Sequence, residues 1–262
     1  MGRARHYASN AERQAAYRQR RAHQILHQIP HVQGEGYAVY QGDALACVPA
    51  LAPCDHVLTD PPYEPAAHTR TRRTRAVLEG RAPYGAIPFA PITDAQRAFV
   101  ARLPCGWRLI FCQVEAVASY QALLGTTYIR TIIWEKPDGA PQFTGDRPAM
   151  GYETIVCAWA RPGRPCWNAG GKRGVYIHDV RDGHPRVHPT QKPIPLLKAL
   201  LRDFTQPGEV ILDPFMGSGS VGVACLETGR RFVGVEIDPA MFAVACQRLQ
   251  TVERQGTLFA AS

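Results

Sequence analysis

Hydrophobic residues occur in short runs along the chain, and two spacings alternate. Continuous apolar runs that end at turn residues are typical of buried strands, and apolar residues three and four positions apart are typical of helices. Strands are predicted over "YAVYQ", "HVLT", "WRLIFC", "TTYIRTIIWEK", "EVILDPF" and "RFVGVEID", and helices over "DAQRAFVARL", "EAVASYQALLG", residues 193–204 and "SVGVACLETG". Strands that alternate with helices predict an α/β fold with a largely parallel sheet.

Three arginine-containing segments interrupt this alternation. Residues 1–30 contain six arginines and a single glutamate, which suits either an arm along phosphates or a solvated terminus. Residues 64–91 and 161–187 are rich in arginine, proline or glycine, and long insertions of this kind are usually functional or disordered. We expect a basic N-terminal arm over residues 1–33 and one domain over residues 34–262 that carries both insertions.

Composition and charge narrow the class of protein. The chain has 262 residues, of which 45% are hydrophobic, as is ordinary for a globular domain. Its formal charge of +8 favours a polyanionic partner. The eight cysteines form no C-x-x-C pair, which predicts free thiols in a reducing cytoplasm and no bound metal. No apolar run approaches the length of a membrane span, and no secretory leader is recognised.

The segment "DPFMGSGSVG" follows a predicted strand and opens a predicted helix. Gly217, Gly219 and Gly222 have the spacing G-x-G-x-x-G, and Glu236 ends the next strand, where an acid can bind ribose hydroxyls. A nicotinamide dinucleotide would suit this pattern. The carboxylate of Asp213, however, would repel a pyrophosphate and attract the ammonium and sulfonium of S-adenosylmethionine. We therefore favour S-adenosylmethionine; a glycine turn without a ligand is the alternative.

A second motif, "HVLTDPPY", ends an apolar run at an acid, two prolines and a tyrosine. Both prolines lack an N–H, so the strand cannot continue and a carbonyl can point into a cleft. The Asp60 carboxylate and the Pro61 carbonyl could then accept hydrogen bonds from an exocyclic amino group and stabilise the charge that grows there during methyl transfer. Pro62 sets the turn, and Tyr63 offers a face for a base taken out of its helix. A simple strand terminator is the alternative interpretation.

Four segments resemble motifs of the DNA amino-methyltransferases, in the permuted order in which the catalytic motif comes first: "DPPY" at Asp60, "HPTQKP" at His188, "DPFMGSGS" at Asp213 and "GVEID" at Gly234. The resemblance covers about residues 37–249. It implies a Rossmann-like, S-adenosylmethionine-dependent methyltransferase fold with a mostly parallel seven-stranded sheet. It also implies a set of cofactor contacts, namely Asp43, Ala44, Thr190, Lys192, Asp213, Phe215, Gly217, Gly219 and Glu236.

Within that set, the resemblance places Asp43 and Ala44 beside the adenine of the cofactor and Thr190 and Lys192 near its methionine end. It also suggests a strand hairpin at the far edge of the sheet, with three residues beside the target pocket: Trp134, Lys136 and Glu153. The two insertions are small for target recognition in this family. Our candidate DNA contacts within them are Arg70, Arg72, Arg73, Lys172 and Arg173.

The function that the resemblance implies is methyl transfer to adenine N6 in double-stranded DNA by base flipping, as in restriction-modification systems. The aspartate at the head of "DPPY" favours adenine, and cytosine N4 is the alternative target. A nicotinamide-dependent oxidoreductase, a non-catalytic DNA-binding protein and a methyltransferase of RNA or protein are the competing classes. We expect a cytoplasmic monomer or homodimer with no membrane partner.

Overall fold

We describe the protein from a computed structural model, which covers residues 26, 28–63, 90–139, 141, 145–146, 148–181 and 191–260, with side chains to residue 255. Several expected features lie outside the described residues. They include most of the basic arm and most of the insertion at 64–91, with the candidate DNA contacts Arg70, Arg72 and Arg73. The expected cofactor contact Thr190 also lies outside the described residues.

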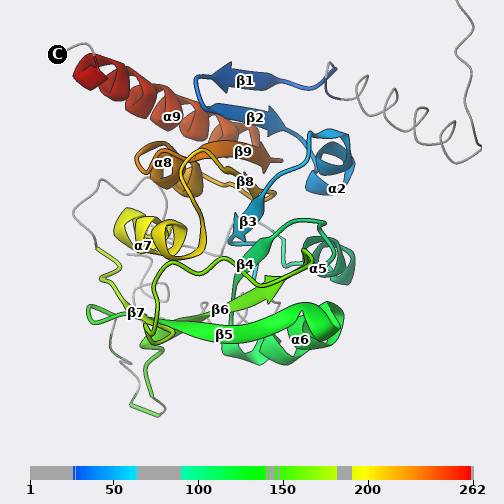
Figure 1. The fold of residues 1–262 in the computed structure, drawn as a ribbon, viewed down its shortest axis with the longest axis vertical. Helices are drawn as coiled ribbons and strands as arrows, with labels where there is room; N and C mark the ends of the chain where they lie inside the picture. Colours follow the sequence, from blue (N-terminus) through cyan, green and yellow to red (C-terminus); the bar gives the residue numbers. More distant parts are fainter. Residues whose placement is uncertain are drawn as a thin grey trace, which may run out of the picture.

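A single mixed sheet of nine strands, in the order β1-β2-β9-β8-β3-β4-β6-β5-β7, forms the centre of the described fold (Figure 1). The α/β class is thus confirmed. The implied sheet of seven strands corresponds to the seven inner strands, to which two short edge strands, β1 and β7, are added. The strands are β1 (His31–Gly34), β2 (Tyr37–Gln41), β3 (His56–Thr59), β4 (Trp107–Cys112), β5 (Tyr128–Glu135), β6 (Tyr152–Trp159), β7 (Val175–Ile177), β8 (Val210–Asp213) and β9 (Arg231–Glu236).

Strand direction decides which residues meet. The neighbouring strands β2, β9, β8, β3 and β4 are all parallel, so their carboxyl ends lie along one edge of the sheet. The next strand, β6, is antiparallel to β4, with Cys112 opposite Thr154. Its first residues therefore lie at the same edge as the last residues of the parallel strands. We call this the carboxyl edge.

Helices cover both faces of the sheet (Figure 1). The apolar sides of α7, α8 and α9 pack on one face, and α2, α5 and α6 pack on the other. The α-helices are α2 (Ala44–Cys47), α5 (Asp94–Ala101), α6 (Val117–Leu124), α7 (Ile194–Phe204), α8 (Ser220–Leu226) and α9 (Pro239–Ala260), and the 3-10 helices are η1 (Val48–Ala50), η3 (Val114–Ala116) and η4 (Gly125–Thr127).

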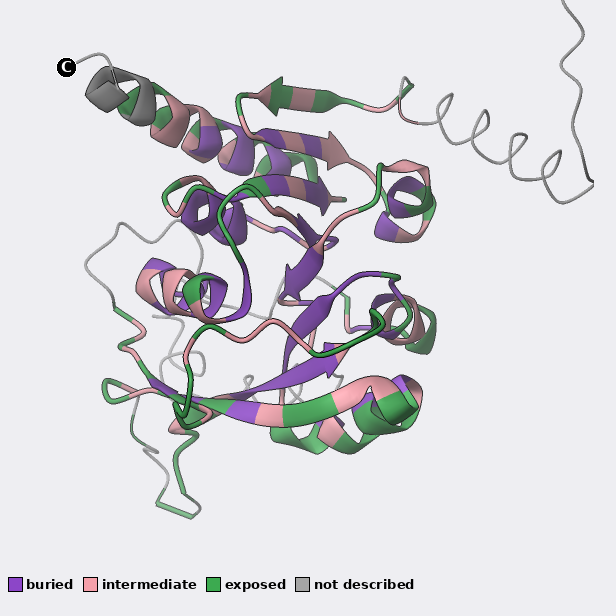
Figure 2. Cartoon of the chain, viewed as in Figure 1, coloured by how far each residue is buried: buried purple, intermediate pink, exposed green. Residues whose placement is uncertain are grey.

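The central strands are buried on both faces, as Figure 2 shows. Alternate residues of β4 divide between the two layers, because successive side chains of a strand point to opposite faces. Leu109 and Phe111 pack with the α7 layer, whereas Ile110 and Cys112 pack with α5 and α6. This explains why the residues of "WRLIFC" are all buried and, except for Arg108, apolar, with no alternation of apolar and polar positions.

All the strands and helices predicted from hydrophobic spacing are present. Gly125 ends α6 with φ of +51°, as expected for a glycine cap. Helix α7 begins at Ile194, since Pro193 is its extended N-cap residue. The antiparallel pair β5 and β6 matches the hairpin implied by the resemblance. Among the described elements, β1, β7 and α9 were not predicted, and neither were the short helix α2, which was expected as a turn, and the 3-10 helices η1 and η4.

The missed elements have simple physical reasons. Strands β1 and β7 have only 4 and 3 residues, and exposed residues alternate with more buried ones in both. They are stabilised by pairing with β2 and β5 and not by an apolar run of their own. β1 also spans the boundary expected between arm and domain. Helix α9 did carry a signal, because Phe242, Ala245 and Leu249 are buried at helical spacing.

The eight cysteines are free, as predicted, and six of them are buried. Within the described residues, no helix combines the length and the hydropathy that a membrane span requires.

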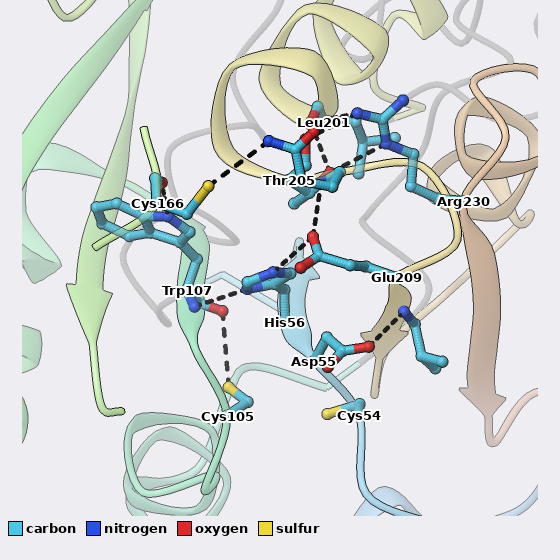
Figure 3. A network of polar contacts seen from close by, with 12 residues as sticks. Cys54, Asp55, His56, Cys105, Trp107, Cys166, Leu201, Thr205, Glu209 and Arg230 are labelled. Atoms are coloured by element: carbon cyan, nitrogen blue, oxygen red, sulfur yellow. Dashed lines mark hydrogen bonds and ion pairs between the residues drawn. The ribbon is translucent and has the colours of Figure 1, made fainter. Parts of the chain in front are cut away.

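A polar network ties together the amino ends of the central strands, at the opposite edge from the carboxyl edge (Figure 3). His56, which is 2% exposed, lies within 3.0 Å of Glu209 Oε2 through Nε2, and its Nδ1 accepts the backbone N–H of Trp107 at 2.9 Å. Because Nδ1 accepts, the proton of the neutral ring is on Nε2 and is donated to Glu209. Burial of the ring lowers the pKa of His56, although Glu209 opposes this shift.

His56→Gln should destabilise the fold by about 1–3 kcal/mol, because the N–H of Trp107 loses its buried acceptor. It should also reduce the pH dependence of stability. The lowered pKa means that the stability contributed by neutral His56 is present above the unfolded value of about 6.5 and is lost as the pH falls through the folded value. Urea unfolding at several pH values between about 5 and 8 measures both effects, and an equal acid slope in the two proteins would contradict this account.

Candidate functional site

The carboxyl edge brings together segments that are far apart in the sequence. The tetrad "DPPY" (residues 60–63) follows β3, and the glycine loop (residues 214–219) follows the neighbouring strand β8. Glu236 ends β9 on the other side of β8, and the first residues of β6 reach the same edge. Ligands of doubly wound folds bind outside the carboxyl ends of the strands. This edge is therefore the candidate site.

Asp60 leaves the sheet directly after the fully buried strand β3. Its side chain is 24% exposed, and its Oδ2 accepts a hydrogen bond from Lys192 Nζ at 2.6 Å. Its Oδ1 is buried and has no hydrogen-bond partner among the described residues. Pro61 is buried, and the Tyr63 carbonyl accepts a hydrogen bond from the N–H of Ile92 at 3.2 Å. The tetrad thus presents one carboxylate oxygen that lacks a donor.

Glu153, from the start of β6, contacts three polar groups: the Tyr63 hydroxyl of the tetrad and the ammonium groups of Lys192 and Lys136. Its Oε2 accepts the Tyr63 hydroxyl at 2.8 Å and lies 3.2 Å from Lys192 Nζ. Its Oε1 accepts Lys136 Nζ at 2.5 Å. Lys192 also donates to the Tyr63 hydroxyl at 2.7 Å. Asp60, Glu153, Lys136 and Lys192 form a cluster of two acids and two bases, so its formal charge is balanced.

Two opposing effects set the pKa values in this cluster: burial disfavours the charged form of each group, and ion pairing favours it. Burial raises the pKa of Asp60, and Lys192 opposes this while Glu153 adds to it. Burial also acts to raise the pKa of Glu153, but Lys192 and Lys136 outweigh it and lower the value to about 2. The pKa of Lys192 is raised, because Asp60 and Glu153 outweigh its desolvation. Glu153 and Lys192 are therefore both charged at neutral pH.

Asp213 ends β8 directly beside the tetrad. Its Oδ1 accepts the Thr59 hydroxyl at 2.7 Å and the N–H of Phe215 at 3.1 Å. Burial raises the pKa of Asp213 to about 7; the two hydrogen bonds oppose the shift, and the charges of Asp60 and Glu236 add to it. A cationic ligand group would reverse this shift by favouring the carboxylate.

Glu236 lies across the glycine loop from Asp213. Its Oε2 accepts the N–H of Gly217 at 2.8 Å, and its Oε1 accepts the N–H of Asp238 at 2.8 Å. Its backbone carbonyl accepts the N–H of Gly42, which places the "GDAL" turn beside it. In that turn Asp43 caps α2 by accepting the N–H of Leu45 at 3.0 Å, and Ala44 is buried.

The glycine loop needs glycine for two different reasons. Gly217 and Gly219 have φ of +51° and +78°, which other residues adopt only with strain. Gly219 also lies against α9, where an added Cβ would be 3.0 Å from the Cβ of Ala245. Arg248 of α9 supports the loop by donating to the Ser218 carbonyl at 2.7 Å. Nothing in the sequence pattern had indicated this role of Arg248.

Gly222, the third glycine of the motif, serves helix packing. A Cβ there would lie 2.7 Å from Phe232 Cδ1 and 2.8 Å from Leu249 Cδ2. Gly222→Ala should therefore destabilise the protein by about 1–3 kcal/mol through overpacking, as chemical denaturation would measure. Gly171→Ala is the control, since an added Cβ meets nothing within 4 Å there. Equal stability of the two variants would contradict the packing role.

Two of the expected DNA contacts, Lys172 and Arg173 on the second insertion, lie within the described residues and away from this cluster. Lys172 pairs with Asp203 Oδ2 and lies 4.2 Å from the Tyr176 ring centroid. Asp203 is near the end of α7, about 14 Å along the helix axis from its first residue, Ile194. Arg173 is exposed beside Lys172. Among the residues that the resemblance set beside the target pocket, Glu153 contacts Tyr63 of the tetrad directly, and Lys136 is linked to the tetrad through Glu153.

Known proteins share both sequence and fold with this chain. Residues 100–247 match a family model for N6 and N4 methyltransferases, described as DNA methylase; the tetrad precedes the matched segment. The type II methyltransferase M.XycI of Xanthomonas campestris pv. cyanopsidis is 32% identical over 135 residues, which are 47% of this chain and 45% of that protein. The chain matches about half the length of such curated relatives.

Solved structures give the same picture at the level of the fold. The crystal structure of the M1.HpyAVI-SAM complex has a TM-score of 0.61 and 25% identity, covering 81% of this chain and 99% of that chain. The cytosine-N4-specific PvuII DNA methyltransferase has a TM-score of 0.58 and covers 84% of this chain and 92% of that chain. At 13% identity, the second likeness shows the fold alone.

Proposed function

Because the chain belongs to the DNA methylase family of N6 and N4 methyltransferases, we propose that it transfers a methyl group from S-adenosylmethionine to the exocyclic amino group of a base in double-stranded DNA. The observation that carries the proposal is the juxtaposition of the tetrad and the glycine loop at the carboxyl edge, where the Thr59 hydroxyl bonds Asp213 at 2.7 Å. A base acceptor and a cofactor loop are thereby direct neighbours.

The donor and acceptor groups of the loop fit S-adenosylmethionine. Asp213 offers a buried carboxylate to the ammonium of the methionine part, and Glu236 offers oxygens to the ribose hydroxyls. Gly217 and Gly219 allow the backbone to approach the ligand closely. Asp43, Ala44, Phe215 and Thr190 remain expected contacts from the resemblance, whereas the ammonium of Lys192, also expected there, contacts Asp60, Tyr63 and Glu153 in the free protein. When bound, the cofactor supplies an electrophilic methyl group on its sulfonium.

The tetrad supplies what the target amino group requires. Its lone pair is delocalised into the base, so two acceptors on the amino hydrogens are needed to make the nitrogen nucleophilic and to stabilise its developing positive charge. Asp60 Oδ1 is buried and lacks a donor among the described residues, and the Pro61 carbonyl is the second acceptor. Pro62 and Tyr63 complete the pocket, and the Tyr63 ring stacks on the flipped base.

Adenine N6 is the target that we propose, because an aspartate heads the tetrad; cytosine N4 presents the same donor to the same acceptors. A nicotinamide-dependent oxidoreductase remains a less favoured function, because its pyrophosphate would face the buried acid Asp213. We further propose that the insertions, with Arg173 exposed on the second, contribute phosphate contacts.

Two measurements test this function. Calorimetric titration should detect binding of S-adenosylmethionine and none of NAD; the reverse result would support the oxidoreductase. Expression in a bacterial host that lacks its own amino-methyltransferases, followed by nucleoside analysis of the host DNA, should reveal N6-methyladenine. N4-methylcytosine alone would correct the target base.

A further inference from the structure

Lys192 has no assigned step in the proposed reaction, yet its ammonium lies within the cluster of charges beside the tetrad. A lysine ammonium has three N–H donors. Three acceptors surround it: Asp60 Oδ2 at 2.6 Å, the Tyr63 hydroxyl at 2.7 Å and Glu153 Oε2 at 3.2 Å. The side chain is 6% exposed. Because each donor has an acceptor, Lys192 has none left for a base or for a cofactor carboxylate.

The two oxygens of Asp60 consequently differ. Oδ2 is held by Lys192, whereas Oδ1 is buried without a hydrogen-bond partner among the described residues. Buried acceptors normally have donors, and one that lacks a donor at a candidate active site indicates where a ligand donor binds. The exocyclic amino group of a flipped base is a donor of the required kind.

We propose that Lys192 is a positioning residue for methyl transfer: it fixes Asp60 through Oδ2 and leaves Oδ1 to the target amino group. This inference rests on the proposed function, since the donor for Oδ1 is the base. Glu153 holds Lys192 in place from the opposite side, and Lys136, at 2.5 Å from Glu153, balances the remaining charge.

The pKa of Asp60 distinguishes a positioning role of Lys192 from a role in packing alone. The charged and titratable groups that act on Asp60 are Lys192, Glu153, Tyr63 and, from the neighbouring strand, Asp213. Burial raises the pKa of Asp60, Lys192 lowers it, and Glu153 raises it. Removing the charge of Lys192 should therefore raise this pKa, and removing the charge of Glu153 should lower it.

The experiment compares Lys192→Met and Glu153→Gln with Lys198→Met, a matched control on α7 whose partner is Glu227. In Lys192→Met, transfer at pH 7 should fall on the order of 100-fold. The acidic limb of the pH–rate profile should move up by about one pH unit or more. In Glu153→Gln the limb should move down, and in Lys198→Met it should not move. The Kd for S-adenosylmethionine should stay within about twofold of wild type in all three.

A readout that does not depend on activity separates this inference from the proposed function. Carbon-13 NMR titration of the Asp60 carboxyl, assigned by comparison with Asp60→Asn, should show the same opposite shifts. If these shifts occur in a protein that methylates nothing, the contact by which Lys192 fixes Asp60 is supported and the proposed function fails. Unchanged Asp60 titration would overturn the positioning role, as would a tenfold weaker cofactor with an unmoved acidic limb. Should Lys192→Met not fold, Glu153→Gln decides the matter alone.

Discussion

Asp60→Ala is expected to lower the rate of methyl transfer by about 10²–10³-fold at saturating cofactor. The substitution removes the acceptor that stabilises positive charge on the target nitrogen. In the free protein the substitution removes the contact of Oδ2 with Lys192, whereas Oδ1 has no partner among the described residues. Single-turnover transfer from labelled S-adenosylmethionine to DNA measures the rate, and calorimetry should show a Kd for the cofactor within about twofold of wild type.

The control for this prediction is Asp94→Ala. Asp94 is the first residue of α5, and its side chain is 98% exposed. The control should transfer methyl groups at the wild-type rate. Near wild-type transfer by Asp60→Ala would contradict the assignment of the tetrad as the base acceptor, and a lost cofactor affinity would show that Asp60 belongs to the cofactor site.

Asp213→Asn is expected to weaken S-adenosylmethionine binding by about 2 kcal/mol or more, which is about 30-fold. Asparagine keeps an Oδ1 that can accept the Thr59 hydroxyl and the Phe215 N–H, so the loop should retain its conformation. Only the charge that attracts the cofactor ammonium is lost. Calorimetric titration of the variant against wild type measures the difference.

The pH dependence gives this prediction a sign. The pKa of Asp213 in the free protein is about 7, so the wild-type affinity should rise as the pH increases through 7 and the carboxyl ionises. The variant should lack this rise. The stability of the folded protein changes with pH in the opposite direction. Because the folded pKa exceeds the unfolded value of about 3.9, the wild type loses stability as the pH rises from about 4 through 7, and Asp213→Asn should be the more stable protein at and above pH 7.

Asp94→Asn again serves as the control and should bind the cofactor like wild type. Equal cofactor affinity of Asp213→Asn and wild type at pH 8 would contradict the role of this carboxylate. The same holds for a wild-type affinity that does not change between pH 6 and pH 8.

Much of the sheet could be predicted because its inner strands are buried. The runs that became β3, β4 and β8 are mostly apolar and almost wholly buried, and the acids Asp60 and Asp213 mark where two of them end. The glycine spacing predicted the loop, and the acid at the end of the next strand predicted its partner, Glu236. In the structure, the backbone N–H of Gly217 in this loop donates a hydrogen bond to Glu236.

The neighbourhood of the tetrad could not be predicted in the same way. Glu153 reaches Tyr63 only because β6 runs antiparallel to β4, a fact of strand order that no local pattern encodes. Lys192 precedes a helix, and the N-terminus of a helix suits an anionic ligand group. Its ammonium instead contacts Asp60, because the acids Asp60 and Glu153 attract it. Thr59, the residue that joins the two loops, is a single hydroxyl at the end of an apolar run.

The central claim is that the tetrad and the glycine loop together methylate an amino group of DNA. The most direct test incubates the purified protein with methyl-labelled S-adenosylmethionine and unmodified bacterial DNA, with RNA and protein substrates in parallel, and identifies the labelled products by mass spectrometry. We predict label in DNA as N6-methyladenine. Label confined to RNA or protein, or no label in any of the three, would contradict the claim.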